Sequence, residues 1–158
     1  MPLPSIDELV AIYSQSRASD IGQSESRLFQ TYGLKPLVSL LVEAFPRIRR
    51  SSGRASILFW LVRFARTHPA VVSLATSALS DRAHLVREYA CSILAYSLRR
   101  DVLPQLALLH AHPDQKTRAA VAAAVDAISH GNHHYFVDRG HTGNTLWGVN
   151  SGDMPSAP

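Results

Sequence analysis

One helical unit occurs twice in the middle of this 158-residue chain, and this repeat constrains the fold more than any other feature. Residues 71–98 and 102–128 align at an offset of 31 residues, a period typical of helical repeats. A looser earlier copy pairs residues 37–45 with 55–65. A single copy cannot bury its apolar face, so stacked copies share one continuous core and leave a surface that usually binds another molecule.

The second helix of each copy follows a common pattern. In the first copy the pattern is Asp-x-x-x-x-Val-Arg-x-x-Ala, which begins at Asp81 and includes Arg87. In the second copy the two charged residues recur with a shorter gap, as Asp114 and Arg118. This pattern resembles a HEAT-type repeat. The resemblance implies stacked helix pairs in which the second helix of each pair lines the inner surface.

The predicted fold is an all-α, HEAT-like α-solenoid of about three helix pairs, with a short N-terminal helix and a C-terminal β-hairpin. We expect one domain over residues 1–150. Its expected parts are an N-terminal cap over 5–33, helical repeats over 36–130 and a hairpin cap over 132–150, followed by a disordered tail over 151–158.

The N-terminal cap is expected to begin with a helix over residues 5–16. Ser5 and Glu8 are spaced as a capping box, in which each side chain bonds the backbone N–H of the other residue. Residues 17–25 are polar and contain Gly22, which predicts a loop.

Composition excludes several classes of protein. The only cysteine, Cys91, cannot form an internal disulfide, and it falls on the apolar side of a predicted helix. No apolar stretch reaches the roughly 18 residues that a membrane span requires, and no signal peptide is recognisable. We therefore expect a cytoplasmic protein without a cofactor.

Positive charge is concentrated in one region. Residues 34–100 hold eleven basic and three acidic residues, a net charge of +8, and ten of the basic residues are arginines. Arginine favours planar contacts with carboxylate or phosphate groups. An apolar helix is expected over residues 55–67. A binding patch is predicted at the four arginines before it, with a solvated linker as the alternative: Arg47, Arg49, Arg50 and Arg54.

Two interpretations are open for the arginines of the repeats. Arg87 and Arg118 begin successive inner helices, and each follows an aspartate, Asp81 or Asp114. They could form a row that faces a ligand, or an Asp–Arg ladder that joins neighbouring repeats. The resemblance to HEAT-type repeats favours the structural ladder.

The predicted hairpin pairs residues 134–138 with 145–149, which are short, aromatic and β-branched. We expect it to cap the exposed end of the last repeat, with Trp147 packed near Val125 and Ile128. The alternative is that one aromatic face of the hairpin binds a protein partner.

Polar side chains at the rim of this hairpin are candidates for partner binding, namely His134, Asp138 and His141. Together with His130 and His133, these histidines could also suggest zinc or nickel. Their spacing matches no known metal site, so helix capping and hairpin hydrogen bonds are the preferred interpretation.

The end of the chain carries a second resemblance. Residues 133–139, together with Gly143, Trp147, Val149 and Asn150, are similar to the ends of small bacterial HEAT-type immunity proteins. Such proteins neutralise secreted toxins by binding them, so the resemblance implies that the partner is a toxin domain.

The sequence contains no nucleophile elbow, phosphate loop or paired catalytic carboxylates. The predicted function is therefore a non-enzymatic protein-binding module, an immunity protein that neutralises a toxin by direct contact. The alternative is a nucleic-acid-binding solenoid that uses the arginines of residues 47–100.

Overall fold

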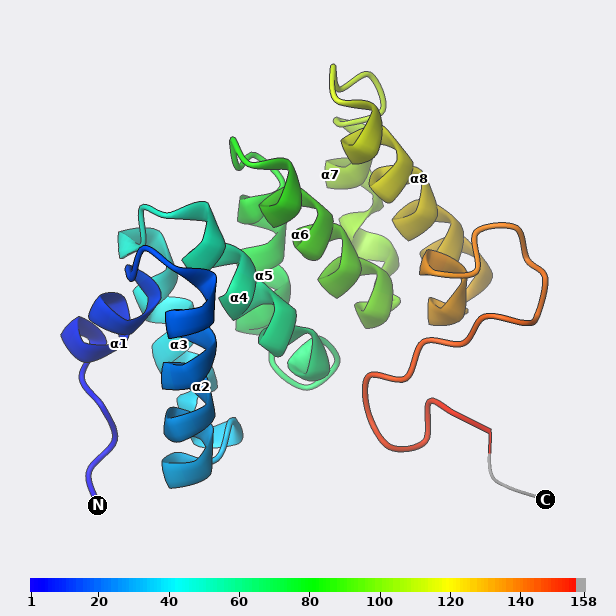
Figure 1. The fold of residues 1–158 in the computed structure, drawn as a ribbon. Coiled ribbons are helices and arrows are strands. Elements are labelled where there is room, and N and C mark those ends of the chain that lie inside the picture. Colours follow the sequence, from blue (N-terminus) through cyan, green and yellow to red (C-terminus); the bar gives the residue numbers. More distant parts are fainter. Residues whose placement is uncertain (156–158) are drawn as a thin grey trace. The chain divides into compact units, whose positions relative to one another are not determined.

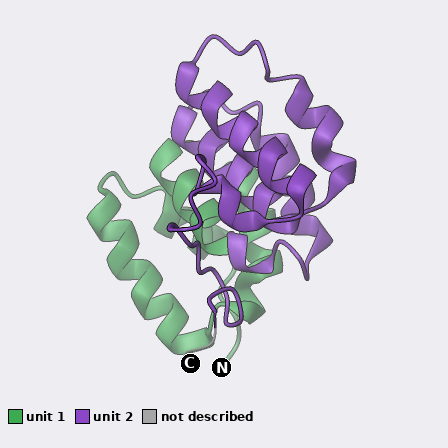
Figure 2. Cartoon of the chain, turned by 90° about the vertical axis from the view of Figure 1, so that its right-hand side faces the viewer, with its two compact units in different colours: residues 1–61 green, residues 62–158 purple. Residues whose placement is uncertain are grey.

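The computed structural model describes residues 1–155, and within that range it is helical without any strand (Figure 1). The chain divides into two compact units, Met1–Leu61 and a second one that starts at Val62 (Figure 2). The single domain expected over residues 1–150 stays a prediction. No helix within residues 1–155 combines the length and the apolar character needed to cross a membrane.

Four α-helices and two 3₁₀ turns make up the first unit. They are α1 (Ile6–Tyr13), α2 (Ala18–Tyr32), η1 (Lys35–Leu37), α3 (Val38–Ala44), η2 (Phe45–Arg47) and α4 (Ser51–Leu61). The capping box is present at α1: the Ser5 N–H donates to Glu8 Oε2 at 2.6 Å, and the Glu8 N–H donates to Ser5 Oγ at 3.1 Å. The predicted start of this helix is therefore confirmed.

The loop predicted over residues 17–25 is wrong, because α2 occupies it. The helix buries Ile21, Glu25 and Leu28, which the helical period places on one face. Burial of that face outweighs the weak helix propensity of the polar residues and of Gly22.

The segment that carries the four arginines, for which a solvated linker was the alternative, is partly helical, since α4 already begins at Ser51. The reason for Gly53 lies in packing. A Cβ atom at this position would lie 1.9 Å from the Tyr13 carbonyl oxygen and 2.9 Å from Ile48 Cγ2. Only glycine allows this close approach of α4 to the end of α1.

The second unit contains the 31-residue repeat. Its elements are η3 (Val62–Phe64), α5 (Pro69–Ala78), α6 (His84–Ser97), η4 (Arg100–Val102), α7 (Leu103–Ala107), α8 (Gln115–His130) and η5 (His133–Phe136). The residues that cap α6 and α8, Ala83 and Asp114, are 31 positions apart. Within this unit α6 packs against both α5 and α8, and α8 also packs against α7.

The predicted β-hairpin is absent. Residues 134–138 and 145–149 contain no strand, and η5 covers part of the first segment. The physical reason is that side chains accept the backbone N–H groups that a strand ladder would have used. The Trp147 N–H donates to His134 Nδ1 at 2.9 Å, and the Val149 N–H donates to Asp153 Oδ2 at 2.9 Å.

The disordered tail was predicted over residues 151–158. Residues 156–158 lie outside the described part of the chain. Asp153 lies within it and accepts the N–H groups of Val149 and Asn150 at 2.9 and 2.7 Å. Residues 137–155 are called the C-terminal segment below.

Candidate functional site

Arg87 is buried where α6 meets α8. Its Nη1 donates to the Asp81 carbonyl oxygen at 2.7 Å, in the loop of its own repeat. Its Nε donates to Thr117 Oγ1 at 2.9 Å and its Nη2 to Asp114 Oδ2 at 3.1 Å, both in the first turn of the next repeat. Arg87 therefore joins two repeats, as the ladder interpretation expects.

Asp114 is held in its charged form at this junction. Its Oδ2 accepts the Thr117 hydroxyl at 2.9 Å, and its Oδ1 accepts the Lys116 N–H at 3.1 Å. The Thr117 hydroxyl, then the Lys116 N–H and the Arg87 guanidinium, lower the pKa of the Asp114 carboxyl below its usual value. The carboxylate thus both caps α8 and receives the arginine.

Arg118 occupies the same position one repeat later, yet it is exposed. Its Nη1 donates to the carbonyl oxygens of His112 at 2.6 Å and Pro113 at 3.0 Å, the former again six residues earlier. Within residues 1–155 its Nε and Nη2 make no hydrogen bond, whereas the same two atoms of Arg87 bind the next repeat. Arg118 therefore uses one of its three guanidinium nitrogen atoms in hydrogen bonds within the described residues.

A groove of about 400 Å³ lies on α8 and is open to solvent. The 31-residue offset relates this face of α8 to the face of α6 that carries Arg87. Three alanines line it along the helix, and three charged or polar residues complete its lining: Ala119, Ala122, Ala123, Asp126, Arg139 and His141. The first four lie on α8 and the last two on the C-terminal segment. Ala119 and Ala122 are exposed.

Asp126 holds one rim of the groove in place. Its Oδ2 lies 2.5 Å from His141 Nε2, and its Oδ1 lies 3.0 Å from His130 Nδ1. The Tyr135 ring stacks on the His141 imidazole at 3.8 Å with 11° between the planes. His141 has a positive φ of 54°, a conformation that a non-glycine residue adopts only when its surroundings fix it.

Arg139 also lines the groove and is fixed by the segment that carries it. Its Nε donates to the Phe136 carbonyl oxygen at 3.0 Å, and its guanidinium carbon lies 5.3 Å from the centre of the Phe136 ring. The groove therefore combines an apolar floor with a rim that carries charges of both signs.

Asp138 was predicted to bind a partner, but it is 4% exposed and organises the loop instead. It accepts the Thr142 hydroxyl at 2.8 Å, the Thr142 N–H at 3.0 Å and the Gly143 N–H at 2.8 Å. The Thr142 hydroxyl and the Gly143 N–H lower the pKa of the Asp138 carboxyl. Asp138 thus positions the loop that presents His141.

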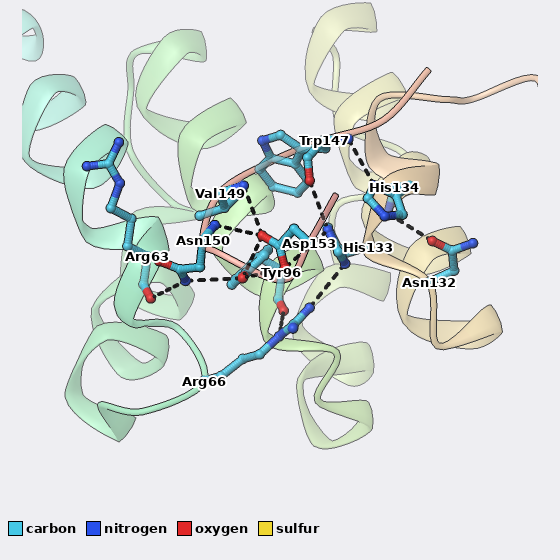
Figure 3. A network of polar contacts seen from close by, with 10 residues as sticks. All are labelled: Arg63, Arg66, Tyr96, Asn132, His133, His134, Trp147, Val149, Asn150 and Asp153. Carbon is cyan, nitrogen blue, oxygen red and sulfur yellow. Dashed lines mark hydrogen bonds and ion pairs between the residues drawn. The ribbon is translucent and has the colours of Figure 1, made fainter. Parts of the chain in front are cut away.

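A polar network fixes the rest of the C-terminal segment (Figure 3). At its centre, Arg66 Nη2 donates to His133 Nδ1 at 3.2 Å, and Arg66 Nε donates to the Tyr96 carbonyl oxygen at 2.7 Å. Since arginine can only donate, His133 Nδ1 accepts, and Nε2 donates to the Trp147 carbonyl oxygen at 3.0 Å. Burial lowers the pKa of His133, so this imidazole is neutral at pH 7.

The far end of the same network anchors the last described residues (Figure 3). Asp153 accepts the Tyr96 hydroxyl at 2.9 Å, and Asn150 Nδ2 donates to the Arg63 carbonyl oxygen at 2.9 Å. Burial raises the pKa of the Asp153 carboxyl, but the hydrogen bonds from Asn150, Val149 and Tyr96 outweigh it and lower the pKa.

Trp147 is half-buried, and it packs through aromatic contacts. Its ring centre lies 5.3 Å from that of Phe136, 5.7 Å from Tyr96 and 5.9 Å from His133. His134, a predicted partner-binding residue, accepts the Trp147 N–H and so also serves the segment. Of the three predicted rim residues, only His141 lies at the groove.

The four arginines of the predicted basic patch differ from one another. Arg54 is 8% exposed, and its Nη1 donates to the carbonyl oxygens of Ile48 at 3.1 Å and Arg49 at 2.5 Å. Arg47 forms an exposed ion pair with Asp7 at 2.7 Å. Arg49 and Arg50 are exposed. Burial therefore removes Arg54 from the surface of the patch.

Three side chains that could carry chemistry are engaged in packing or pairing. Burial, then the charge of Glu88, raises the pKa of the Cys91 thiol to about 12, so it is not a reactive thiolate at pH 7. Both His130 and His141 pair with Asp126. Residues 1–155 contain no group of three metal-ligating side chains suited to hold an ion.

Sequence reasoning missed the alanine face, Asp126 and Arg139. The repeat alignment held a usable signal, because the 31-residue offset relates Ala122 to Cys91 and Asp126 to Ala95. Cys91 and Ala95 are fully buried on α6. An aspartate at the second position marks the face of α8 as one that no further repeat covers.

Comparison with models of protein families, with curated proteins and with solved structures found no match to this chain.

Proposed function

We propose that this protein binds another protein through the open face of α8 and performs no chemistry of its own. The observation that carries this proposal is the groove over Ala119 and Ala122, with its rim of Asp126, Arg139 and His141. An apolar floor within a charged and polar rim is the common composition of protein interfaces. The hydrogen bonds of Asp138 and Asp126 hold this rim in one conformation before any partner arrives, which reduces the entropic cost of binding.

The buried polar groups of the second unit favour binding over catalysis. His133, Asp138 and Asp153 each have their hydrogen-bonding atoms engaged by the C-terminal segment, by α6 or by Arg66. The Cys91 thiol is protonated at pH 7. A catalytic group needs a reactive atom that a substrate can reach, and these groups are used to hold the fold.

We further propose that the partner is a bacterial toxin domain and that the protein acts in the cytoplasm as an immunity protein. This part of the proposal rests on the resemblance to HEAT-type immunity proteins. The test is to search the neighbouring genes for a toxin, to co-express that toxin with the chain and to measure binding by calorimetry. We expect growth to be rescued and a Kd below about 1 μM, which corresponds to roughly −8 kcal/mol. Absence of both results would refute the toxin partner.

Nucleic-acid binding is the second candidate, favoured by the exposed neighbours Arg49 and Arg50. It ranks lower because several other arginines are engaged by protein groups: Arg54, Arg66, Arg87, Arg99 and Arg100. Phosphate contacts make binding fall steeply with salt. Retention of a DNA duplex at about 50 mM salt that disappears near 200 mM would support this candidate.

A further inference from the structure

We propose that the groove on α8 receives a single α-helix of the partner protein, and that the first turn of that helix carries a carboxylate which Arg118 binds. This inference deepens the proposed function and rests on it. It derives from a comparison that the repeat itself provides, because α6 shows what the same surface looks like when a helix covers it.

Arg118 has the same position on α8 that Arg87 has on α6. Arg87 and Arg118 are both the fourth residue of their helix, and the Nη1 atom of each bonds the carbonyl oxygen six residues earlier. On α6, the remaining donors bind the capping carboxylate of Asp114 and the hydroxyl of Thr117, in the first turn of the next helix. On α8, the equivalent donors point from an exposed side chain. The chemistry that fits them is therefore a carboxylate with a neighbouring hydroxyl.

The floor of the groove consists of small side chains. Ala119, Ala122 and Asp126 are spaced by three and four residues and so lie on one face of α8. Small side chains on such a face let a second helix approach closely, as they do between α6 and α8, where Cys91 and Ala95 are buried. A groove with an alanine floor fits the ridge of a helix better than an extended strand, because strands gain their affinity from exposed sheet edges.

Charged side chains at and near the groove indicate the charge of the partner helix. Arg118 stands near the start of α8, and Arg139 lines the groove beside Asp126, whose two oxygens face His141 and His130. The two arginines therefore favour an acidic partner helix, which also agrees with the preference of helix first turns for carboxylates. A second copy of this chain is a poor occupant, because Asp114, the carboxylate that starts its own α8, already binds Arg87.

The probe is a stapled helical peptide of residues 113–130, which begins with the acid and hydroxyl that Arg87 recognises. Its binding to the full-length chain is measured by fluorescence anisotropy. We expect Arg118→Glu and Ala122→Trp each to weaken binding at least tenfold, and Arg118→Gln to weaken it less. Lys116→Glu is the matched control, since it changes the charge equally in the same turn and leaves the groove intact. Circular dichroism and melting temperatures check that every variant is folded.

The peptide should also displace the toxin from the wild-type chain, and a peptide with Asp114→Asn should bind more weakly. Lack of peptide binding up to about 1 mM, or equal binding by the wild type and Arg118→Glu, would overturn the inference. So would a concentration-dependent dimer that Arg118→Glu dissolves, because a second copy would then fill the groove. Toxin binding that saturating peptide leaves unchanged would also overturn it while the proposed function stands. Peptide binding without toxin binding would support the helix site and refute the toxin partner.

Discussion

Equivalent faces of α6 and α8, related by the 31-residue offset, differ in burial: the face of α6 is covered and that of α8 is open to solvent. On α6 the face is closed, since Arg87, Cys91 and Ala95 are buried and Arg87 donates to Asp114 of the next repeat. On α8 the corresponding Arg118 and Ala122 are exposed, and Asp126 has replaced the small apolar residue. The last repeat therefore keeps the arginine and the small side chains of this interface, while at Asp126 His141 of the C-terminal segment lies where a further repeat would pack.

The arginines should show the largest difference between the two faces. Arg87→Ala removes three hydrogen bonds and leaves the Asp114 carboxylate partly buried without its cation, so we expect a loss of about 3 kcal/mol in the free energy of unfolding. Arg118→Ala, the matched change, should cost less than about 0.5 kcal/mol because the side chain is exposed. Urea denaturation measures both, and equal losses would refute the comparison.

Larger side chains should give the second-largest difference in stability between the two faces. Cys91→Leu inserts atoms into a position with no exposed surface and should destabilise by about 2 kcal/mol through overpacking. Ala122→Leu adds the side chain to an exposed position and should change stability by less than about 0.5 kcal/mol. Thermal unfolding of the two variants tests this, and a large loss for Ala122→Leu would mean that α8 is covered.

Trp147 tests how firmly the C-terminal segment holds the groove rim. Because the indole is half-buried rather than enclosed, Trp147→Ala should cost about 2 kcal/mol, below the 3–5 typical of a large aromatic core residue. If the segment acts as a cap, the melting temperature should fall. An unchanged melting temperature combined with loss of the partner would instead make Trp147 a binding residue.

The smallest effect is a pH dependence from His133. Its folded pKa lies below the unfolded value, so its contribution to stability is present above the unfolded pKa of about 6.5 and is lost as the pH falls through the folded pKa. Protonation would place a hydrogen on Nδ1, which faces Arg66. Unfolding free energies measured between pH 7.5 and 5 should decline, and His133→Gln should flatten that decline. An identical slope in both proteins would exclude His133 as the cause.

Local signals predicted the parts of the structure that depend on neighbouring residues. The capping box began α1 as expected, and the C-cap of α8 is Gly131 at a φ of 61°, where glycine carries no steric penalty. The repeat placed Arg87 and Arg118 at equivalent positions, and the structure pairs Arg87 with Asp114 of the next repeat, an arrangement that the ladder interpretation includes. Such features need no knowledge of the remaining chain.

Distant partners decided the parts that the sequence misjudged. Two short segments of aromatic and β-branched residues predicted a hairpin, but His134 and Asp153 accept the N–H groups of Trp147 and Val149, which a ladder would require. The loop predicted around Gly22 became α2 because Glu25 found donors in Ser56 Oγ at 2.5 Å and Trp60 Nε1 at 3.1 Å. A buried carboxylate is tolerated only with such partners.

The sequence by itself determined the helical class and the 31-residue register, because period and capping are local properties of a chain. Only the tertiary structure decided that Arg54 is buried, that Asp138 holds a loop and that Ala122 and Asp126 line an open groove. Whether a side chain is covered depends on which segment packs over it. For α8, nothing in its own pattern of residues specifies that segment.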